Sequence, residues 1–239
     1  MRAPLALAAR ALVALAVMLS ACKPRERGTG SASASAEPSV ARPPSRSASA
    51  LLVAGVKLQQ AGKNAEAEEQ LLAAIDTGAL SSTELAQAWT IVGITREERD
   101  DFARAIEAHD ESIAAKSDYE VAWVNKGIAL RRSDKPDEAQ RAYEKALEIN
   151  PRYAEAWASI GALQLLHSKD AKKAVESLEK AIALDPKVAV AHANLALAYA
   201  ELGRFADADV ALQRAVEKGY KNEAKMREMI EAARAAQKK

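Results

Sequence analysis

A single cysteine, few glycines and prolines, and almost no aromatic side chains limit what this sequence can be. One cysteine in 239 residues excludes a disulfide framework and any zinc site built on paired cysteines. Only 10 glycines and 8 prolines, together with 49% hydrophobic residues, exclude a chain that is disordered throughout. We therefore expect a folded body, and the length allows either one domain or one array of repeats.

The chain also has little net charge, and what it has is unevenly distributed. Lys and Arg number 34 against 33 Asp and Glu. Residues 22–50 carry a net charge of +3, whereas residues 51–239 carry a net charge of −4. Non-specific binding to nucleic acid needs a basic face that replaces phosphate counterions. We therefore expect no nucleic-acid partner for the body.

Motifs of known catalytic chemistry are missing from the sequence. HExxH, GxSxG, a P-loop and an EF-hand loop are all absent, and Gly28-Thr29-Gly30 lacks the third glycine of a dinucleotide-binding loop. The acidic run at residues 97–101 contains Arg99 and has no regular alternation of ligands, so a solvated turn fits it better than a divalent-cation site. The sequence thus predicts that the chain is not an enzyme and holds neither a cofactor nor a metal.

The N-terminus is typical of a secretion signal. Arg2 and Arg10 bracket the basic start, and the apolar run at residues 11–19 is too short to span a bilayer. The following Leu19-Ser20-Ala21-Cys22 resembles the bacterial lipobox. This resemblance implies that residues 1–21 are a signal peptide and that Cys22 carries acyl chains such as palmitate. The alternative is an idle thiol at Cys22.

Residues 22–47 are rich in Ser, Ala, Pro and Arg and contain almost no large apolar side chain. Such a segment cannot offset its chain entropy by burial, so we expect a disordered tether. Its root-mean-square length is about 25–30 Å. Lys23 follows the cysteine where Asp implies retention in the inner membrane. The lipoprotein resemblance therefore favours a lipid-anchored protein of the outer membrane that faces the periplasm.

From residue 48 onwards the sequence repeats with a period of 34 or 35 residues. Trp89, Trp123 and Trp157 share one position with His192, and a small residue follows four positions after each. Further small residues recur later in each unit, for example Ala139 and Ala146 in the third. This pattern resembles the tetratricopeptide repeat (TPR).

Each unit also contains two stretches with helical periodicity, such as 119–132 and 136–149, separated by breaker residues. Stacked helix pairs bury the face that one pair alone would leave bare. We predict an all-α fold, a right-handed α-solenoid of about five TPR helix pairs with a C-terminal capping helix. The expected repeats cover 48–81, 86–118, 119–152, 153–187 and 188–220, with the capping helix and tail at 221–239.

Several positions depart from the apolar pattern. Polar side chains replace apolar or small ones at Arg96, His109, Ser112 and Lys126. One interpretation is that the second repeat is adapted to bind a partner or to flex. The other is that the repeat is degenerate and the long stems of Lys and Arg carry their charges past the edge of the core. His167 and His192 have no partner at metal-ligand spacing, so packing or surface roles are expected. The equal spacing of the tryptophans indicates a core position, not a binding cage.

The TPR resemblance implies that the first helix of each pair lines a concave face. The residues it places there are Thr90, Ile94, Val121, Val124, Ile128, Arg131, Ala158, Ala162, Leu165, Val190, Ala193 and Leu197. Small and aliphatic residues dominate this set, so a clamp for a C-terminal carboxylate is not expected. An apolar groove suits an amphipathic helix or a hydrophobic extended segment. Alternatively, the chain itself or a second copy covers the groove, as in a weak homodimer.

These observations predict a lipid-anchored, non-catalytic interaction scaffold of the bacterial cell envelope. Its concave apolar groove would bind another envelope protein or a peptide segment. A narrower hypothesis is that the chain is similar to the pilotin lipoproteins that help an outer-membrane secretin of type IV pili to assemble. A further alternative is a docking subunit for a peptidoglycan hydrolase or a protease.

Overall fold

The computed structural model describes residues 47–237, and all regular elements in that range are α-helices. The predicted signal peptide, Cys22 and nearly all of the predicted tether lie outside the described residues. No described helix is long and apolar enough to cross a membrane. The helices are α1 (Ala48–Gln60), α2 (Asn64–Asp76), α3 (Ser82–Glu97), α4 (Phe102–Ala115), α5 (Glu120–Arg132), α6 (Pro136–Ile149), α7 (Ala154–Leu166), α8 (Ala171–Leu184), α9 (Ala189–Glu201), α10 (Phe205–Glu217) and α11 (Glu223–Ala236).

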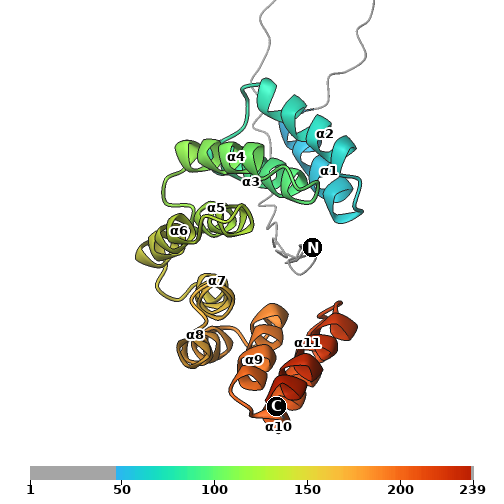
Figure 1. Ribbon diagram of the computed structural model, residues 1–239. Helices are drawn as coiled ribbons and strands as arrows, with labels where there is room; N and C mark the ends of the chain where they lie inside the picture. Colours follow the sequence, from blue (N-terminus) through green and yellow to red (C-terminus); the bar gives the residue numbers. More distant parts are fainter. Residues whose placement is uncertain (1–46, 238–239) are drawn as a thin grey trace, which may run out of the picture.

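The helices form five antiparallel pairs, α1/α2 to α9/α10, followed by the single helix α11. The odd-numbered helices up to α9 lie on the inside of a curved array and the even-numbered helices on its outside (Figure 1). Each outer helix packs against the inner helix of the next pair, and successive inner helices also contact one another. The predicted all-α solenoid is confirmed.

The second inner helix is longer than the sequence pattern indicated. We expected the second repeat to begin at residue 86, but α3 begins at Ser82 and has 16 residues. The additional turn is stabilised by a capping box, in which Glu84 N donates to Ser81 Oγ and the Glu84 carboxylate accepts from Ser81 N at 2.9 Å. Residues 82–85 therefore belong to the repeat and do not separate two repeats.

The turn between the helices of a pair always uses one residue with positive φ. Gly62 and Gly203 have φ of 75°, and the equivalent Asp100, Asp134 and Lys169 have φ of 60°, 63° and 55°. A left-handed conformation is costly for residues with a Cβ, and Asp tolerates it better than Lys. Lys169 is therefore the least favourable residue among these five turns.

We expect Lys169→Gly to stabilise the protein by about 0.5–1 kcal/mol, because it removes the strain of a side chain at positive φ. Urea denaturation followed by circular dichroism measures the change. Lys169→Ala is the matched control, since it shortens the side chain without relieving the backbone, and it should give no gain. Gly62→Ala should instead destabilise the protein. No neighbouring atom lies within 4 Å of a Cβ added at Gly62, so only the φ of 75° disfavours alanine there.

A close crossing of the two helices explains the small residue in the middle of each inner helix. At Gly127 of α5, an added Cβ would lie 2.6 Å from Cδ1 of the Tyr143 ring and 3.0 Å from its Cζ. Tyr143 itself is completely buried. Three other pairs have the same arrangement, with a glycine under an outer-helix side chain: Gly55 under Leu71, Gly93 under His109, and Gly161 under Leu178.

The two ends of the array are closed in different ways. At the start, the side of α1 that would face a preceding pair carries Ala50, Ala54 and Lys57, which are short or charged. At the other end, α11 packs on α9 and α10 and buries Met226 and Ile230, as predicted for a capping helix. Neither end exposes a large apolar surface within residues 47–237, where the most exposed large hydrophobic side chain is that of Val210, at 50%.

Candidate functional site

The concave face is lined by one side of each inner helix, because the other sides pack against neighbouring helices. Along α5, residues Val121, Asn125, Ile128 and Arg132 follow the spacing i, i+4, i+7 and i+11, which selects a single helix face. The equivalent residues of the other inner helices keep at least a few per cent of their surface accessible. We call this set the inner row: Ser49, Val53, Val56, Gln60; Gln87, Ile91, Ile94, Glu98; Val121, Asn125, Ile128, Arg132; Glu155, Ser159, Ala162, Leu166; Val190, Asn194, Leu197, Glu201.

Half of the predicted binding residues lie in the inner row. The structure places six of them on this face, at Ile94, Val121, Ile128, Ala162, Val190 and Leu197. Most residues in the middle of the inner row are aliphatic, although Asn125, Ser159 and Asn194 also lie there. Its margins carry carboxylates, amides, a hydroxyl and the Arg132 guanidinium beside a few aliphatic side chains. Binding of a partner in an apolar groove stays a prediction.

Five other predicted residues are buried between helices and cannot reach a partner unless the array opens. Their exposed fractions are 5% or less, and they are Thr90, Val124, Ala158, Leu165 and Ala193. Thr90, Val124, Ala158 and Ala193 occupy one repeat position, where the inner helix meets the core of its own and the adjacent pair. These five residues pack in the core, and Leu197 of the inner row is as little exposed as Leu165, at 5%.

The last predicted residue, Arg131, is half-buried beside its own outer helix. Burial raises the pKa of the Tyr143 hydroxyl to about 12, and the neighbouring Arg131 guanidinium acts in the opposite direction. On its other side, Arg131 adds to burial in lowering the pKa of His167 at the end of α7. Arg131 therefore lies between two pairs at the turn edge of the array, not in the middle of the groove.

The inner row also contains polar residues that the sequence analysis did not select. Asn125, Ser159 and Asn194 occupy one repeat position, directly after the buried Val124, Ala158 and Ala193. The Asn125 amide donates to Val121 O at 2.8 Å. Counting four, seven and eleven residues onward from Val121 would have found this face in the sequence.

The repeated tryptophan position is structural, as expected. The indole Nε1 donates to a backbone carbonyl six residues earlier, from Trp123 to Ser117 at 3.0 Å and from Trp157 to Pro151 at 3.1 Å. His192 makes the same contact from Nε2 to Pro186 O at 3.0 Å, so that nitrogen carries the proton. His192 thus reproduces the hydrogen bond of the tryptophan that it replaces.

The polar side chains of the second repeat pair with one another inside the array. Ser112 Oγ donates to Ala86 O at 2.7 Å, so the 2.8 Å contact between the two hydroxyls is donated by Thr90. His109 is fully buried, and its Nε2 lies 3.1 Å from Glu97 Oε1. These pairs satisfy groups that would otherwise be buried without partners.

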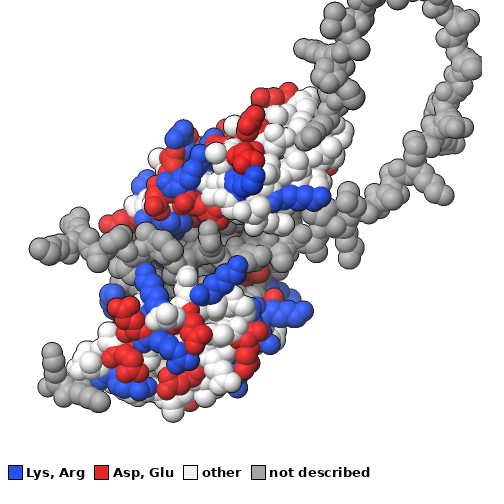
Figure 2. All heavy atoms as spheres, turned by 90° about the vertical axis from the view of Figure 1, so that its right-hand side faces the viewer, with Lys and Arg blue, Asp and Glu red and all other residues white. Residues whose placement is uncertain are grey.

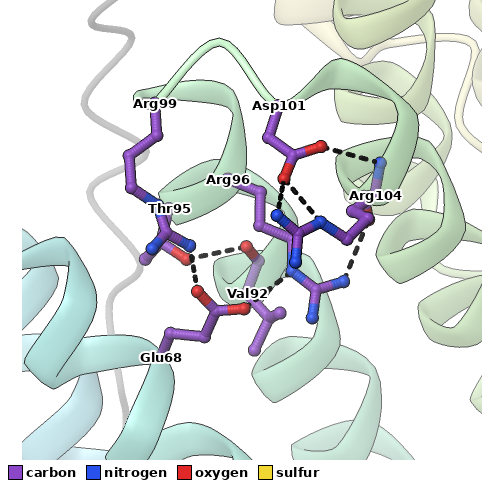
Figure 3. Close-up of polar contacts among 7 residues, drawn as sticks. All are labelled: Glu68, Val92, Thr95, Arg96, Arg99, Asp101 and Arg104. Atoms are coloured by element: carbon purple, nitrogen blue, oxygen red, sulfur yellow. Dashed lines mark hydrogen bonds and ion pairs between the residues drawn. The ribbon is translucent and has the colours of Figure 1, made fainter.

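Charged residues also join the first helix pair to the second. Figure 3 shows Glu68 of α2 between the guanidinium groups of Arg96 and Arg99, with Arg96 Nε 2.8 Å from Glu68 Oε1. Burial would raise the pKa of Glu68, but hydrogen bonds and charge from the two arginines outweigh it and hold that pKa below its usual value. Asp101 caps α4 and pairs with Arg104 (Figure 3).

Within the acidic run at residues 97–101, Glu97 and Asp100 are thus used in polar contacts and Asp101 in a helix cap. No group of three or more His, Cys, Asp or Glu suited to a metal ion occurs in the described part of the chain. On the open side of the curve, acidic and basic side chains are interspersed over the described surface, without a large area of one sign (Figure 2). Such a mixed surface gives no electrostatic track for nucleic acid.

Comparison with known families agrees with the repeat pattern. Two family models, both described as tetratricopeptide repeat, match residues 121–153 and 165–232. Over these two segments the chain is similar to tetratricopeptide repeats. A comparison with curated proteins finds no match.

Solved structures with this TPR arrangement come from several proteins. A thermophilic TPR protein of Thermus thermophilus is 22% identical, with a TM-score of 0.65 over 78% of this chain and 98% of its own. A chain of the APC/C Cut9–Hcn1 hetero-tetramer is 17% identical, with a TM-score of 0.69 over 81% of this chain and 37% of its own. MamA is 22% identical, with a TM-score of 0.51 over 69% of this chain and 93% of its own. At these identities the likeness concerns the fold alone, and a TPR solenoid generally serves as a non-catalytic scaffold that binds proteins.

Proposed function

We propose that this chain is a lipid-anchored interaction scaffold of the bacterial cell envelope, which holds a partner segment against its inner row. The observation that carries the proposal is the aliphatic middle of that row, to which every inner helix from α1 to α9 contributes. Ile94 and Ile128 of this middle, and Leu166 at the margin of the row, come from three successive inner helices and are half-buried, so part of each side chain stays accessible. An apolar surface of this length suits the apolar side of an amphipathic helix or an extended hydrophobic segment.

The lipid anchor in this proposal rests on the lipobox-like Leu19-Ser20-Ala21-Cys22. More than one acyl chain on a cysteine gives stable attachment to a bilayer, whereas one chain gives only marginal attachment. The tether of residues 22–47 would place the start of the array at a root-mean-square distance of about 25–30 Å from the acylated cysteine. A partner held there would be concentrated at the envelope.

We expect Cys22→Ser to move the protein out of the membrane fraction, because the acylated sulfur is lost. Fractionation of cells and the intact mass of the protein measure this together. The wild type should fractionate with membranes and gain the mass of its lipids after loss of residues 1–21. Equal membrane association and equal mature mass for both proteins would contradict lipid anchoring. That result would not bear on binding of a partner at the inner row.

Binding through the inner row is tested by Ile128→Glu in affinity capture from cross-linked membranes. We expect at least about a tenfold loss of the captured partner, because binding would have to desolvate a carboxylate in place of an apolar side chain, even where Arg132 pairs with it. Val210→Glu is the matched control: Val210 is 50% exposed on the outer helix α10. Val124→Glu would be a poor probe, since Val124 is only 3% exposed and its replacement would damage the core.

Equal capture by wild type and both variants would contradict binding at the inner row. A thermal melt of Ile128→Glu must accompany the capture, so that a loss of binding is not confused with unfolding. The identity of a partner lost only in Ile128→Glu then distinguishes the narrower hypotheses. A secretin subunit would support the pilotin-like role, and a hydrolase or protease would support the docking role.

A further inference from the structure

The junctions between successive helix pairs differ in whether a large hydrophobic cluster extends across them. One hydrophobic cluster includes buried residues of every helix from α7 to α10 together with α11. A second joins α5 and α6 to α7, and a third joins α1 and α2 to α3 and α4. The junction between α3/α4 and α5/α6 has no comparable cluster among the described residues. Its apolar contacts are Ile106, half-buried against the second cluster, and a small group around Ala86, Tyr119 and Ala122.

Charged side chains add to the contacts at this junction. Arg132 of α5 lies 2.9 Å from Asp100 Oδ1 and 3.5 Å from Glu97 Oε2, both of the preceding pair. Its guanidinium also lies over the Phe102 ring, 4.5 Å from the centroid. Lys126 of α5 pairs with Asp110 of α4 at 2.6 Å. We call these contacts of Arg132 and Lys126 the latch.

The latch is accessible to water, unlike the core on either side of it. The Arg132 and Lys126 side chains are 20% and 23% exposed, and Asp100 and Asp110 are 63% and 52% exposed. Exposed ion pairs contribute little stability and are weakened by salt. Apolar clusters do not respond to salt in this way. The small cluster of Ala86, Ile113, Tyr119 and Ala122 persists when the latch is weakened, so it can act as a pivot.

The buried side of the latch depends on a polar contact as well. Glu97 is 6% exposed and divides its two oxygens between Arg132 and the buried His109. In the other four described pairs the residue equivalent to His109 is Leu71, Tyr143, Leu178 or Leu212, so among these pairs only the second has a side chain at this position that contacts a buried carboxylate. Of the departures that the sequence left open between adaptation and degeneracy, His109 and Lys126 therefore contribute to this junction, whereas Arg96 pairs with Glu68 of the first pair.

We propose that α1–α4 and α5–α11 form two rigid blocks that rotate relative to each other at this junction, opened by loss of the latch and guided by the pivot. The helices themselves stay folded during the rotation. The inner row crosses the junction between Ile94 and Ile128, so its shape on the two sides of the junction changes when the latch opens. This device is independent of which partner the groove binds.

The test measures distances between the blocks with pairs of spin labels in the full chain carrying Cys22→Ser. One label replaces Arg141, which is exposed on α6. The second replaces either Glu69 on α2, across the junction, or Val210 on α10, within the same block. At about 0.05 M salt, where surface charges are weakly screened, both pairs should give one narrow distance distribution. At about 1 M salt only the pair across the junction should broaden.

Arg132→Met should broaden the same distribution without added salt, with about a tenfold rise in the open fraction. Arg132→Lys keeps the charge but loses the two-pronged geometry, and its distribution should lie in between. The proposal is wrong if neither salt nor Arg132→Met broadens the distance across the junction. It is also wrong if the pair within α5–α11 broadens equally, because that would be general loosening. If Arg132→Met does not fold, the salt series on the labelled protein that keeps Arg132 tests the proposal by itself.

Discussion

Replacing Gly127 with alanine is expected to lower the free energy of unfolding by about 2–3 kcal/mol. The new methyl group would overlap the Tyr143 ring, whose Cδ1 and Cζ lie 2.6 and 3.0 Å from the position of the added Cβ. Tyr143 is fully buried, so its rigid ring cannot move aside without displacing α6 from α5. Urea denaturation followed by circular dichroism measures the loss.

The double variant Gly127→Ala/Tyr143→Leu should recover part of that loss. The last pair already combines alanine and leucine at these positions, since Ala196 of α9 and Leu212 of α10 are both fully buried. The recovery identifies the overlap as the cause, because a loss of glycine flexibility alone would be unaffected by Tyr143. A Gly127→Ala protein as stable as the wild type would show that the crossing has more room than its geometry implies.

The fold could be predicted because the sequence of each repeat alone indicates a helix pair. The 34-residue period of Trp89, Trp123 and Trp157 reflects a helix pair that packs only on its neighbours, so one unit predicts the next. Even the departure at His192 is consistent, since its Nε2 bonds to Pro186 O as the indoles bond to their carbonyls. The start of α3 was missed because the capping box at Ser81 and Glu84 adds a turn that other repeats lack.

The lining of the groove could be predicted only in part. Val124 and Asn125 are neighbours in sequence, and both are candidates for an inner surface on helical periodicity alone. Which one faces the groove depends on how steeply successive inner helices cross, and that angle follows from packing between repeats. The structure buries Val124 at 3% exposure and turns Asn125 to the groove at 7%, so the difference in exposure is small.

The network of the second repeat could not be predicted from spacing. Glu97 and His109 are 12 residues apart, and Arg132 is 35 residues beyond Glu97, on another pair. A single sequence shows each of them as an isolated polar residue, and only His109 stands at a position where the other repeats have Leu or Tyr. Only the assembled junction shows that they neutralise and hydrogen-bond one another.

Replacing Glu97 with leucine is expected to destabilise the protein by about 2–4 kcal/mol, since it leaves buried polar partners behind. His109 Nε2 loses the carboxylate 3.1 Å away, and its Nδ1 already has no hydrogen-bond partner among the described residues. Arg132 keeps Asp100 but loses its buried acceptor. His109→Leu alone should also be destabilising, because Glu97 Oε1 would then be buried without a donor.

The double variant Glu97→Leu/His109→Leu should cost much less than the sum of the two single variants. The pair α7/α8 already has this apolar solution, with Leu165 and Leu178 at the same two positions over Gly161. Replacing both partners removes the unsatisfied groups that each single variant leaves, so we expect a coupling free energy of about 1–3 kcal/mol in a double-mutant cycle from urea denaturation. Additive losses would instead mean that Glu97 and His109 stabilise the array through separate contacts, with Arg132 as the main partner of the carboxylate.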